Sequence, residues 1–401
     1  MRKGIDDYRE IVGDEVLSKI FAKAKRLSNK HILHINSTYQ GGGVSEILNS
    51  LVLLMNDIGI FTGWRILHGT PDFFSITKKF HNAMQGEKIN LTETKRFIYT
   101  ETNENFARFT HINHDCVIIH DSQPLPLIKF YRKRQPWIWR CHIDISNQTP
   151  ELWDYLKTFI IRYDLVLVSH EKYKKKDLLV PQRVLLPSID PLGHKNKPID
   201  EDVIRKYLHK FRIPTDKPII AQISRFDKWK DPEGVIEVFE LAKQEVDCRL
   251  VLCGNMATDD PEGEQIYHRL VQKTRRSKDI IFIMHESPIL ANALQRKASV
   301  IIQKSLREGF GLTVTEALWK GTSVVASNVG GLPLQVIDGK TGFLVEPNDI
   351  EKFADRVVKL LKDRELAKEL GKNGRAHVKE NFLITRHILD YMDILIETLY
   401  S

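Results

Sequence analysis

The chain has 401 residues, more than one hydrophobic core usually supports, and its 60 Lys and Arg against 52 Asp and Glu give a net charge of +8. A hydrophobic fraction of 42% and a charged fraction of 28% are typical of a soluble globular protein. No apolar run reaches the length of a transmembrane helix, so no membrane-spanning helix is predicted. The N-terminus has no apolar stretch like that of a signal peptide, so secretion is not predicted. Four cysteines without C-x-x-C spacing fit a reducing cytoplasm.

The N-terminal part predicts the opening of an α/β fold. Residues 5–28 have the apolar spacing of one amphipathic helix, and His31–Asn36 reads as a strand. The glycine turn Gly41–Gly43 leads from that strand into a second helix that runs to Ile58. The turn has neither the G-x-G-x-x-G spacing nor a Walker lysine, so two interpretations stay open. It could face a phosphate or a sugar, or its glycines could simply relieve crowding.

Five further strands are predicted before residue 187, and most are continuous apolar runs of the kind found in buried parallel sheets. They are Thr62–Leu67, Cys116–His120, Trp137–Ile143, Leu165–Ser169 and Val184–Leu186. His120 and Asp121 close one strand, and His142 with Asp144 closes another. Ligands of open α/β sheets bind outside the carboxyl ends of strands, so these pairs are candidate site residues. Each histidine taken alone could instead be structural.

The segment Pro187–Pro218 is rich in proline and charge, contains one short helix (Asp202–Phe211), and is expected to connect two domains as a hinge. The alternation of strands and helices then restarts, which predicts a second parallel α/β domain. Its strands are Ile219–Ile223, Arg249–Cys253, Ile280–Met284, Ser299–Gln303, Ser323–Ala326 and Gly342–Val345.

The second half carries two candidate site segments and a further glycine loop, Asn328–Pro333. Ser224–Lys230 follows a strand and brings Arg225 and Lys230 to its end, as a diphosphate would need. Arg307–Gly321, reading R-E-G-F-G-L-T-V-T-E-A-L-W-K-G, predicts a glycine turn followed by a helix. Free N–H groups at a helix start, with a glutamate on each side, suit hydroxyls or anions. An ordinary turn with surface glutamates is the alternative.

In this order, the N-terminal glycine loop, S-R-F-D-K-W-K and E-G-F-G-L-T-V-T-E resemble the retaining GT-B glycosyltransferases of family four, over nearly the whole chain. Narrower motifs, among them H-G-T-P-D-F-F at 68–74 and P-W-I-W-R-C-H-I-D at 136–144, look like the trehalose glycosyltransferring synthases. The retaining trehalose phosphorylases are the nearest neighbours. The resemblance implies an α/β fold of GT-B type, with two Rossmann-like parallel-sheet domains facing across a cleft. Residues 1–192 would form the acceptor-side domain, residues 193–382 would bind the nucleotide sugar, and a helix at about 383–401 would cross back to the first domain.

The same resemblance implies roles for individual residues. Glu316 would bind the ribose hydroxyls, and Glu308 would lie near the 3-hydroxyl of the donor glucose. Arg225 and Lys230 would neutralise the diphosphate, and His142 would lie near the anomeric carbon and the donor 6-hydroxyl. These last four are the expected catalytic residues. Backbone groups complete the donor site: Gly42, Gly43, Phe310, Gly311, Leu312 and Thr313. The acceptor residues, expected from strand-end position and the narrower resemblance, are His68, His120, Asp121 and Gln123.

The implied reaction is retaining glucosyl transfer from ADP- or UDP-glucose to free glucose, giving α,α-trehalose. The alternatives are trehalose phosphorolysis, transfer to another acceptor, and sugar-nucleotide epimerisation. Nucleic-acid binding is disfavoured because the basic residues are scattered, except for the short cluster Lys174–Lys176. No D-x-D pair stands at an expected strand end, so no protein-held metal is predicted, although Mg²⁺ can accompany the diphosphate. A homodimer stays open.

Overall fold

The computed structural model describes residues 3–40, 42–254, 261–285 and 287–400. The chain divides into two compact units. The first unit runs to Ser188 and takes in the C-terminal segment from Ile384, and the second unit is Ile189–Leu383. The chain therefore passes between the units twice, at 188/189 and at 383/384. Each unit is described separately below.

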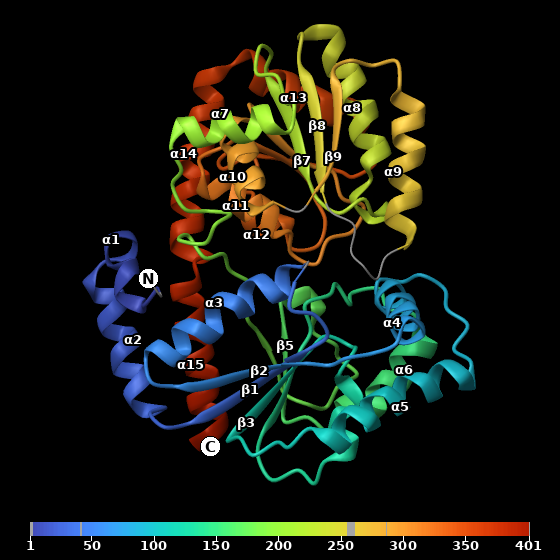
Figure 1. Ribbon diagram of the computed structural model, residues 1–401, viewed down its shortest axis with the longest axis vertical. Coiled ribbons are helices and arrows are strands. Elements are labelled where there is room, and N and C mark those ends of the chain that lie inside the picture. The colour runs from blue at the N-terminus through green and yellow to red at the C-terminus, as the bar shows by residue number, and fades with distance from the viewer. Residues whose placement is uncertain (1–2, 41, 255–260, 286, 401) are drawn as a thin grey trace. The chain divides into compact units, whose positions relative to one another are not determined.

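The first unit is built on a six-stranded parallel sheet of order β2-β1-β3-β4-β5-β6 (Figure 1). Its strands are β1 (His31–Asn36), β2 (Phe61–Ile66), β3 (Cys116–His120), β4 (Trp137–Arg140), β5 (Leu165–Val168) and β6 (Gln182–Val184). The predicted parallel sheet is confirmed, with two shifts. β4 ends at Arg140, so His142 lies in the loop beyond the strand, and β6 begins at Gln182, earlier than predicted.

Ten helical segments of the described chain belong to the first unit. They are η1 (Ile5–Tyr8), α1 (Arg9–Val12), α2 (Asp14–Arg26), α3 (Gly43–Asp57), α4 (Pro71–Met84), α5 (Glu93–Phe109), η2 (Leu125–Phe130), α6 (Pro150–Ile160), η3 (Glu171–Tyr173) and α15 (Ile384–Tyr400). The prediction of one helix over 5–28 is wrong, because Gly13 adopts a φ of 83° and interrupts it. A left-handed residue of this kind cannot continue a right-handed helix.

The two faces of the first sheet differ in chemistry, because successive side chains of a strand point to opposite faces. Leu33, Ile35, Val117 and Ile119 belong to an apolar core that also includes residues of α4, α5 and α6. On the other face, the polar side chains His34, Asn36 and His120 stand among apolar ones such as Ile32 and Ile118. There α15 packs on α2 and α3, on the opposite side of the sheet from α4–α6 (Figure 1). The C-terminal helix therefore lies on the side of the sheet that carries these histidines, and its Tyr391 ring is 5.7 Å from that of His34.

The second unit contains a parallel sheet of order β12-β11-β10-β7-β8-β9. Its strands are β7 (Ile219–Ile223), β8 (Arg249–Gly254), β9 (Ile280–Met284), β10 (Val300–Gln303), β11 (Val324–Ser327) and β12 (Phe343–Val345). All six were predicted to within one residue at each end. The strand order reverses between β7 and β10, and crevices at such switch points are where α/β sheets bind ligands.

The helices of the second unit cover both faces of its sheet. They are α7 (Glu201–Lys210), η4 (Lys228–Lys230), α8 (Pro232–Glu245), α9 (Pro261–Thr274), α10 (Pro288–Lys297), α11 (Leu312–Trp319), α12 (Leu332–Gln335), α13 (Ile350–Lys362) and α14 (Arg364–Asn381). Residues of α8, α9 and α13 share one apolar core with the strands. α10 and α11 contact β7 and β10.

The first crossing between the units, at 188/189, falls within the segment 187–218 that was expected to connect the domains, but most of that segment is packed structure. From Ile189 onward it belongs to the second unit, and α7 packs on α10. The Asn292 side-chain amide donates hydrogen bonds to the carbonyls of His194 and Lys197, at 3.1 and 2.9 Å. These bonds tie the segment to α10, so its prolines and charges belong to a packed structure.

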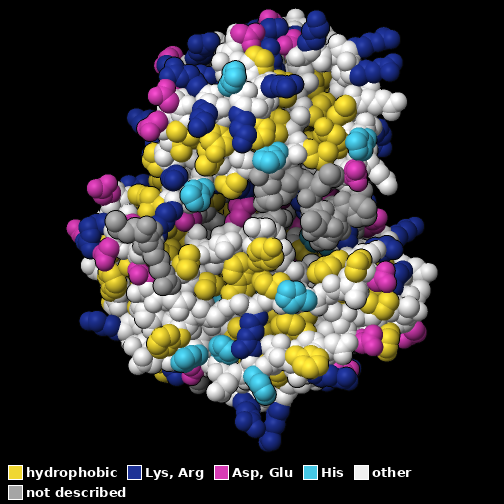
Figure 2. Space-filling model, viewed as in Figure 1, with side chains coloured by type: hydrophobic (Ala, Val, Ile, Leu, Met, Phe, Trp, Pro, Cys, Tyr) yellow, Lys and Arg dark blue, Asp and Glu magenta, His cyan; other side chains and the backbone are white. Residues whose placement is uncertain are grey.

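The surface carries charges of both signs. On the face drawn in Figure 2, Lys and Arg side chains are spread over the molecule with Asp and Glu among them. Within the described part of the chain, no helix is both long and apolar enough to cross a lipid bilayer.

Candidate functional site

The strand ends at the β7/β10 switch point bring together a cation and a carboxylate. Lys230 ends the short helix η4 after β7, and Glu308 lies in the loop after β10. Their side chains form an ion pair, with 18% of the Lys230 side chain and 9% of the Glu308 side chain exposed. Gln303 and Ser305 also donate to Glu308 Oε2, each at 3.3 Å. The carboxylate is therefore held in one place by three neighbours.

A buried glutamine joins the loops that carry this pair. Gln222, in β7, donates to the carbonyl of Lys230 at 3.0 Å and accepts from the N–H of Lys304 at 3.2 Å. Lys304 forms a further ion pair with Asp231, and only 2% of the Lys304 side chain is exposed. Asp231 has a φ of 45° and caps α8 through the N–H of Gly234. These bonds fix the two strand ends relative to each other.

Arg225 is the second cation predicted for this loop, and its side chain is 35% exposed. Its guanidinium is 3.8 Å from the buried Asp227, whose other oxygen accepts the N–H of Trp229 at 2.8 Å. The Arg307 guanidinium lies 5.2 Å from the centre of the Trp229 ring. Arg225 and Lys230 thus follow the same strand, as the sequence predicted, and Arg225 is the more accessible of the two.

The predicted glycine turn and helix are both present. Gly311 has a φ of 88° and precedes α11, which begins at Leu312. A Cβ at Gly311 would lie 2.8 Å from Leu332 Cδ2, so only glycine fits there. The Phe310 carbonyl accepts a hydrogen bond from the Gln335 amide, and the Phe310 side chain is buried. The N–H groups of Leu312 and Thr313 belong to the first turn and have no acceptor within the helix.

Glu316 lies one turn into α11 and is only 2% exposed. Its carboxylate accepts a hydrogen bond from Gln295 at 3.1 Å and lies 3.8 Å from the Lys195 ammonium. Lys320 donates to the Glu316 carbonyl at 3.1 Å and to Asn196 Oδ1 at 2.9 Å. The alternative of two surface glutamates is therefore wrong, because both Glu308 and Glu316 are buried.

In the first unit, the glycine turn precedes α3. Gly41 lies outside the described residues. Gly42 has an extended backbone and is the N-cap of α3, whose first residue is Gly43. A Cβ placed on Gly42 would have no atom within 4 Å, so crowding does not explain a glycine at this position.

Three histidines of the first unit, His34, His120 and His142, contact one another in a row. His34 Nδ1 lies 2.9 Å from His120 Nε2, and His120 Nδ1 lies 2.9 Å from His142 Nε2. Burial lowers the pKa of His34 to about 3 and holds the pKa values of His120 and His142 well below the ordinary range. The three imidazoles are therefore neutral at pH 7.

Asp121 fixes the backbone beside this group. It has a φ of 58°, and its Oδ1 accepts the N–H of His142 at 2.8 Å. Burial raises the pKa of Asp121 to about 6. Arg140 is fully buried and donates to Ser169 Oγ at 3.1 Å and to the Leu185 carbonyl at 2.7 Å. Its Nε and Nη1 have no hydrogen-bond partner among the described residues.

The predicted acceptor residues are only partly brought together. His120 and Asp121 are joined with His142 as described above. Gln123 follows them, and its carbonyl accepts a hydrogen bond from Asn103 at 3.1 Å. His68 is exposed in the loop after β2, two residues before Thr70 caps α4. Among the described residues, no hydrogen bond or ring contact links the His68 or Gln123 side chain to the three histidines.

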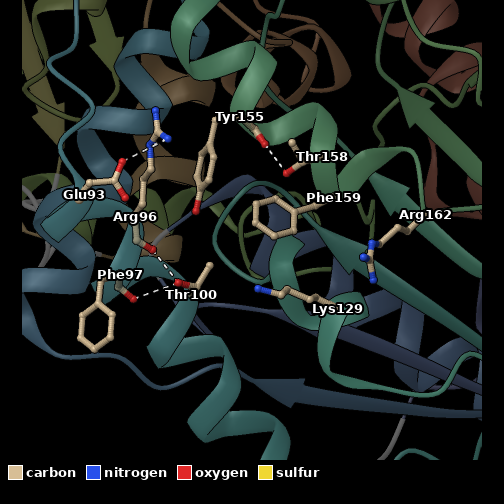
Figure 3. Close-up of a pocket in the computed structure, with 9 residues that line it drawn as sticks. All are labelled: Glu93, Arg96, Phe97, Thr100, Lys129, Tyr155, Thr158, Phe159 and Arg162. Carbon is tan, nitrogen blue, oxygen red and sulfur yellow. Dashed lines mark hydrogen bonds and ion pairs between the residues drawn. The ribbon is translucent and has the colours of Figure 1, made fainter.

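A separate hollow of about 480 Å³ lies in the helical layer of the first unit, on α5, η2 and α6 (Figure 3). Arg96, Lys129 and Arg162 border it, and the Arg96 guanidinium lies 5.2 Å from the centre of the Tyr155 ring. None of the sequence-predicted site residues lines this hollow. The candidate functional site is therefore formed by the residues at the strand ends and does not include this hollow.

No group of three or more His, Cys, Asp or Glu side chains within the described ranges is arranged to hold a metal ion. Several residues of the candidate site carried no signal in the sequence, and their contacts alone reveal them: His34, Arg140, Lys195, Gln222, Gln295 and Gln303.

Two family models match the chain. Residues 34–175 match the family described as "Trehalose synthase, N-terminal domain", and residues 203–377 match "Glycosyl transferases group 1". The chain is 46% identical over 400 residues to the trehalose synthase of Thermococcus litoralis, covering 98% of this chain and 97% of that protein. It is 29% identical to the trehalose phosphorylase of Pleurotus pulmonarius, covering 94% of this chain but only 58% of that protein.

The solved structure of a sucrose-phosphate synthase from Thermosynechococcus elongatus has a similar fold. The TM-score is 0.71 at 20% sequence identity, and the match covers 93% of this chain and 99% of that one. At this identity the likeness concerns the fold alone.

Proposed function

The chain belongs to the trehalose synthase family, a family of glycosyltransferases with the GT-B fold, and on that premise we propose the following reaction. The enzyme is a hexosyltransferase that moves glucose from a nucleoside diphosphate glucose to free glucose. The products are α,α-trehalose and the nucleoside diphosphate, and the anomeric configuration of the donor is retained.

The observation that carries this proposal is the grouping at the β7/β10 switch point. Arg225 and the Lys230–Glu308 ion pair lie at the ends of the strands, and the free N–H groups of α11 follow the second strand end. Cleavage of the bond between sugar and diphosphate adds negative charge to the phosphate, which cations and helix N-termini stabilise. Glu308 would accept hydrogen bonds from the hydroxyls of the transferred sugar.

In the proposed mechanism, the acceptor hydroxyl attacks from the side that the diphosphate leaves. The departing phosphate takes the proton of that hydroxyl, so the donor supplies the base. No protein carboxylate is assigned as nucleophile. His142 would contact the sugar through Nδ1, since its Nε2 is already bound to His120. Exclusion of water matters because water would compete as acceptor.

Trehalose phosphorylase is the second candidate, and Glu316 argues against it. A buried carboxylate with Gln295 on one side and Lys195 on the other is suited to a pair of ribose hydroxyls. Phosphate as leaving group would leave this carboxylate without use. The relatives named as phosphorylases are also more distant and longer than this chain.

The test is product analysis with ADP-, UDP- and GDP-glucose and free glucose. Formation of trehalose and the nucleoside diphosphate from one of these donors is the expected result. Trehalose formed only from glucose 1-phosphate and glucose would indicate the phosphorylase. Incubation of each donor alone checks for epimerised product.

We propose further that no metal is held by the protein and that any Mg²⁺ accompanies the diphosphate. Chelator present in the assay should then change the rate only as far as it removes Mg²⁺ from the donor. Treating the protein alone with chelator before the assay should leave the rate unchanged. The proposed partners are the donor and glucose, with no nucleic acid or membrane, and a homodimer stays open. The cytoplasm is the proposed compartment, supported by four cysteines that are all free and buried.

A further inference from the structure

Three histidines of the first unit lie on a diagonal across neighbouring strands. In the register of the sheet, His34 of β1 is opposite Ile118 of β3, and His120 of β3 is opposite Arg140 of β4. His120 therefore stands two residues further along β3 than the position opposite His34, and His142 lies two residues beyond Arg140, in the loop that follows β4. Steps of two residues keep side chains on one face, which explains how H-I-N, I-I-H-D and R-C-H-I-D bring their histidines together.

Each contact in this row requires a donor on one side and an acceptor on the other. A neutral imidazole has one N–H and one free lone pair. His120 uses both of its nitrogens, so it must donate to one neighbour and accept from the other. Both hydrogen bonds then run in the same direction. The consequence is that all three histidines are the Nδ1–H tautomer, or all three are the Nε2–H tautomer.

Several charged and titratable groups face the row, and they favour neutral imidazoles. Burial is the largest cause of the lowered pKa values of His120 and His142. The charge of Arg140, which stands on the same face, lowers both pKa values further. From α15, His387 donates Nδ1–H to the Leu186 carbonyl at 2.8 Å, and the Tyr391 ring lies 5.7 Å from that of His34. Asp121 holds the His142 backbone N–H. Of the two His142 nitrogens, only Nδ1 is left for any further partner.

We propose that His34 and His120 are positioning residues that fix the tautomer of His142. The row presents His142 Nδ1 as a pure acceptor when all three are Nε2–H, and as a pure donor when all three are Nδ1–H. The catalytic consequence rests on the proposed function. A sugar hydroxyl at His142 would meet a ring nitrogen that is always a donor or always an acceptor, because the tautomer of His142 is set by His34 through His120. The tautomer relationship itself needs no substrate.

The first test is ¹⁵N NMR of the histidine rings in the full-length protein without substrate. The ring nitrogen shifts distinguish the two tautomers, and loss of signals in His34→Asn, His120→Asn and His142→Gln assigns them. We expect His34, His120 and His142 to share one tautomer in the unsubstituted protein. Unlike tautomers, or a rapidly exchanging mixture at any of the three in the unsubstituted protein, would overturn the proposal.

The second test changes the far end of the row. His34→Leu removes the partner of His120, so the His142 signals should shift toward a tautomer mixture. His34→Asn keeps a polar atom near the Nδ1 position and should restore the single tautomer. His387→Asn is the matched control, because it alters a buried histidine of the same layer that lies outside the row. Unchanged His142 signals in His34→Leu would overturn the proposal.

Kinetics give the third measurement. His34→Leu should lower kcat by about 10-fold, with little change in KM for the nucleotide sugar, and His34→Asn should recover most of the loss. Equal losses in both variants would mean that His34 acts only structurally. An unsubstituted protein that makes no disaccharide but shows one shared tautomer would refute the proposed function and leave the histidine relationship intact.

Discussion

Lys230 and Glu308, 78 residues apart in the chain, form an ion pair between the loops that follow β7 and β10, two strands that are neighbours in the sheet. Each side chain is largely covered, and the carboxylate has Gln303 and Ser305 as further neighbours. The pair therefore joins the two loops of the candidate donor site and neutralises both charges there.

Replacing one residue of the Lys230–Glu308 pair should show how much the two side chains stabilise each other. Lys230→Ala leaves Glu308 partly buried without its cation, and we expect a loss of about 1–3 kcal/mol in the free energy of unfolding. The double variant Lys230→Ala/Glu308→Ala should lose less than the sum of the single losses, measured by urea unfolding. Additive losses would show that the two side chains do not interact in solution. In the proposed reaction the same cation faces the leaving phosphate, so Lys230→Ala should also reduce kcat.

Arg225→Ala should lower turnover more than donor affinity. In the proposed reaction the guanidinium stabilises charge that grows as the phosphate leaves, so its contribution is largest in the transition state. We expect kcat to fall by at least about 100-fold while KM for the donor changes little. Arg269→Ala is the matched control, because Arg269 of α9 is 65% exposed, pairs with Glu233 and should leave kcat unchanged. A raised KM with normal kcat would restrict Arg225 to ground-state binding.

Glu316→Ala should weaken nucleotide binding. A buried carboxylate that accepts hydrogen bonds from two ribose hydroxyls contributes roughly 2–4 kcal/mol of affinity, and calorimetry with the free nucleoside diphosphate measures the loss. Glu346→Ala serves as control, because Glu346 is exposed and its carboxylate accepts a hydrogen bond from the Asn328 side chain at 2.8 Å. Nucleotide affinity that is the same in both variants would remove Glu316 from the ribose site.

Lys320 should make stability depend on pH. Burial lowers its pKa from 10.5 to about 7, with Arg296 and Lys195 adding to the effect and Glu316 opposing it. Between pH 7 and 10.5 the unfolded chain binds a proton at Lys320 that the folded chain does not, so stability rises with pH in this window. The penalty is fully present below pH 7 and disappears above 10.5.

The comparison of the native protein with Lys320→Met isolates this effect. The difference in unfolding free energy should change by up to ~1.4 kcal/mol per pH unit between pH 7.5 and 9, because the variant lacks the rise. Other groups titrate equally in both proteins and cancel. A constant difference over this range would mean that Lys320 keeps its ordinary pKa in the fold.

The sequence predicted both sheets and the turn before α11, because buried strands and helix starts leave local signals. Continuous apolar runs mark β3 and β7, and the helix after Gly311 follows from local spacing. The break at Gly13 was missed, since the apolar periodicity continues through it and only its positive φ interrupts the helix. Composition placed a crossing between the units within 187–218, where the chain does cross at 188/189, but it did not show that the residues from Ile189 onward pack as part of the second unit.

The sequence predicted the glycines and glutamates of the site, but it did not predict the residues that support them. Gln222 and Gln303 look like ordinary strand positions, and their roles appear only when β7 and β10 are placed side by side. His34 gave no signal for the same reason, because its partner is 86 residues away in the chain. Local patterns report backbone geometry, whereas these contacts depend on the strand order, which no local pattern contains.

The last prediction concerns the acceptor. Trehalose joins two glucoses through both anomeric carbons, so the acceptor pocket must recognise a whole pyranose in one orientation. A site built on hydrogen bonds rejects analogues that lack a hydroxyl far better than analogues that differ in bulk. His120 and Asp121 offer such polar groups at a strand end of the first unit. We therefore expect glucose to be accepted, and we expect glucose 6-phosphate to react poorly because we predict no Lys or Arg pair in the acceptor pocket to receive its phosphate.

Rates with glucose, 2-deoxyglucose and glucose 6-phosphate under the same nucleotide sugar test this expectation. Loss of one hydroxyl should reduce kcat/KM more strongly than a change of bulk at the same carbon, because the pocket group that loses its partner stays buried and unpaired. Asp121→Asn should keep most of the discrimination, since asparagine tolerates a φ of 58° and its side-chain oxygen can still accept the His142 N–H. Asp121→Ala should lose it together with that hydrogen bond. If only glucose 6-phosphate reacts, the acceptor assignment is wrong, while a hexosyltransferase that uses the β7/β10 site remains.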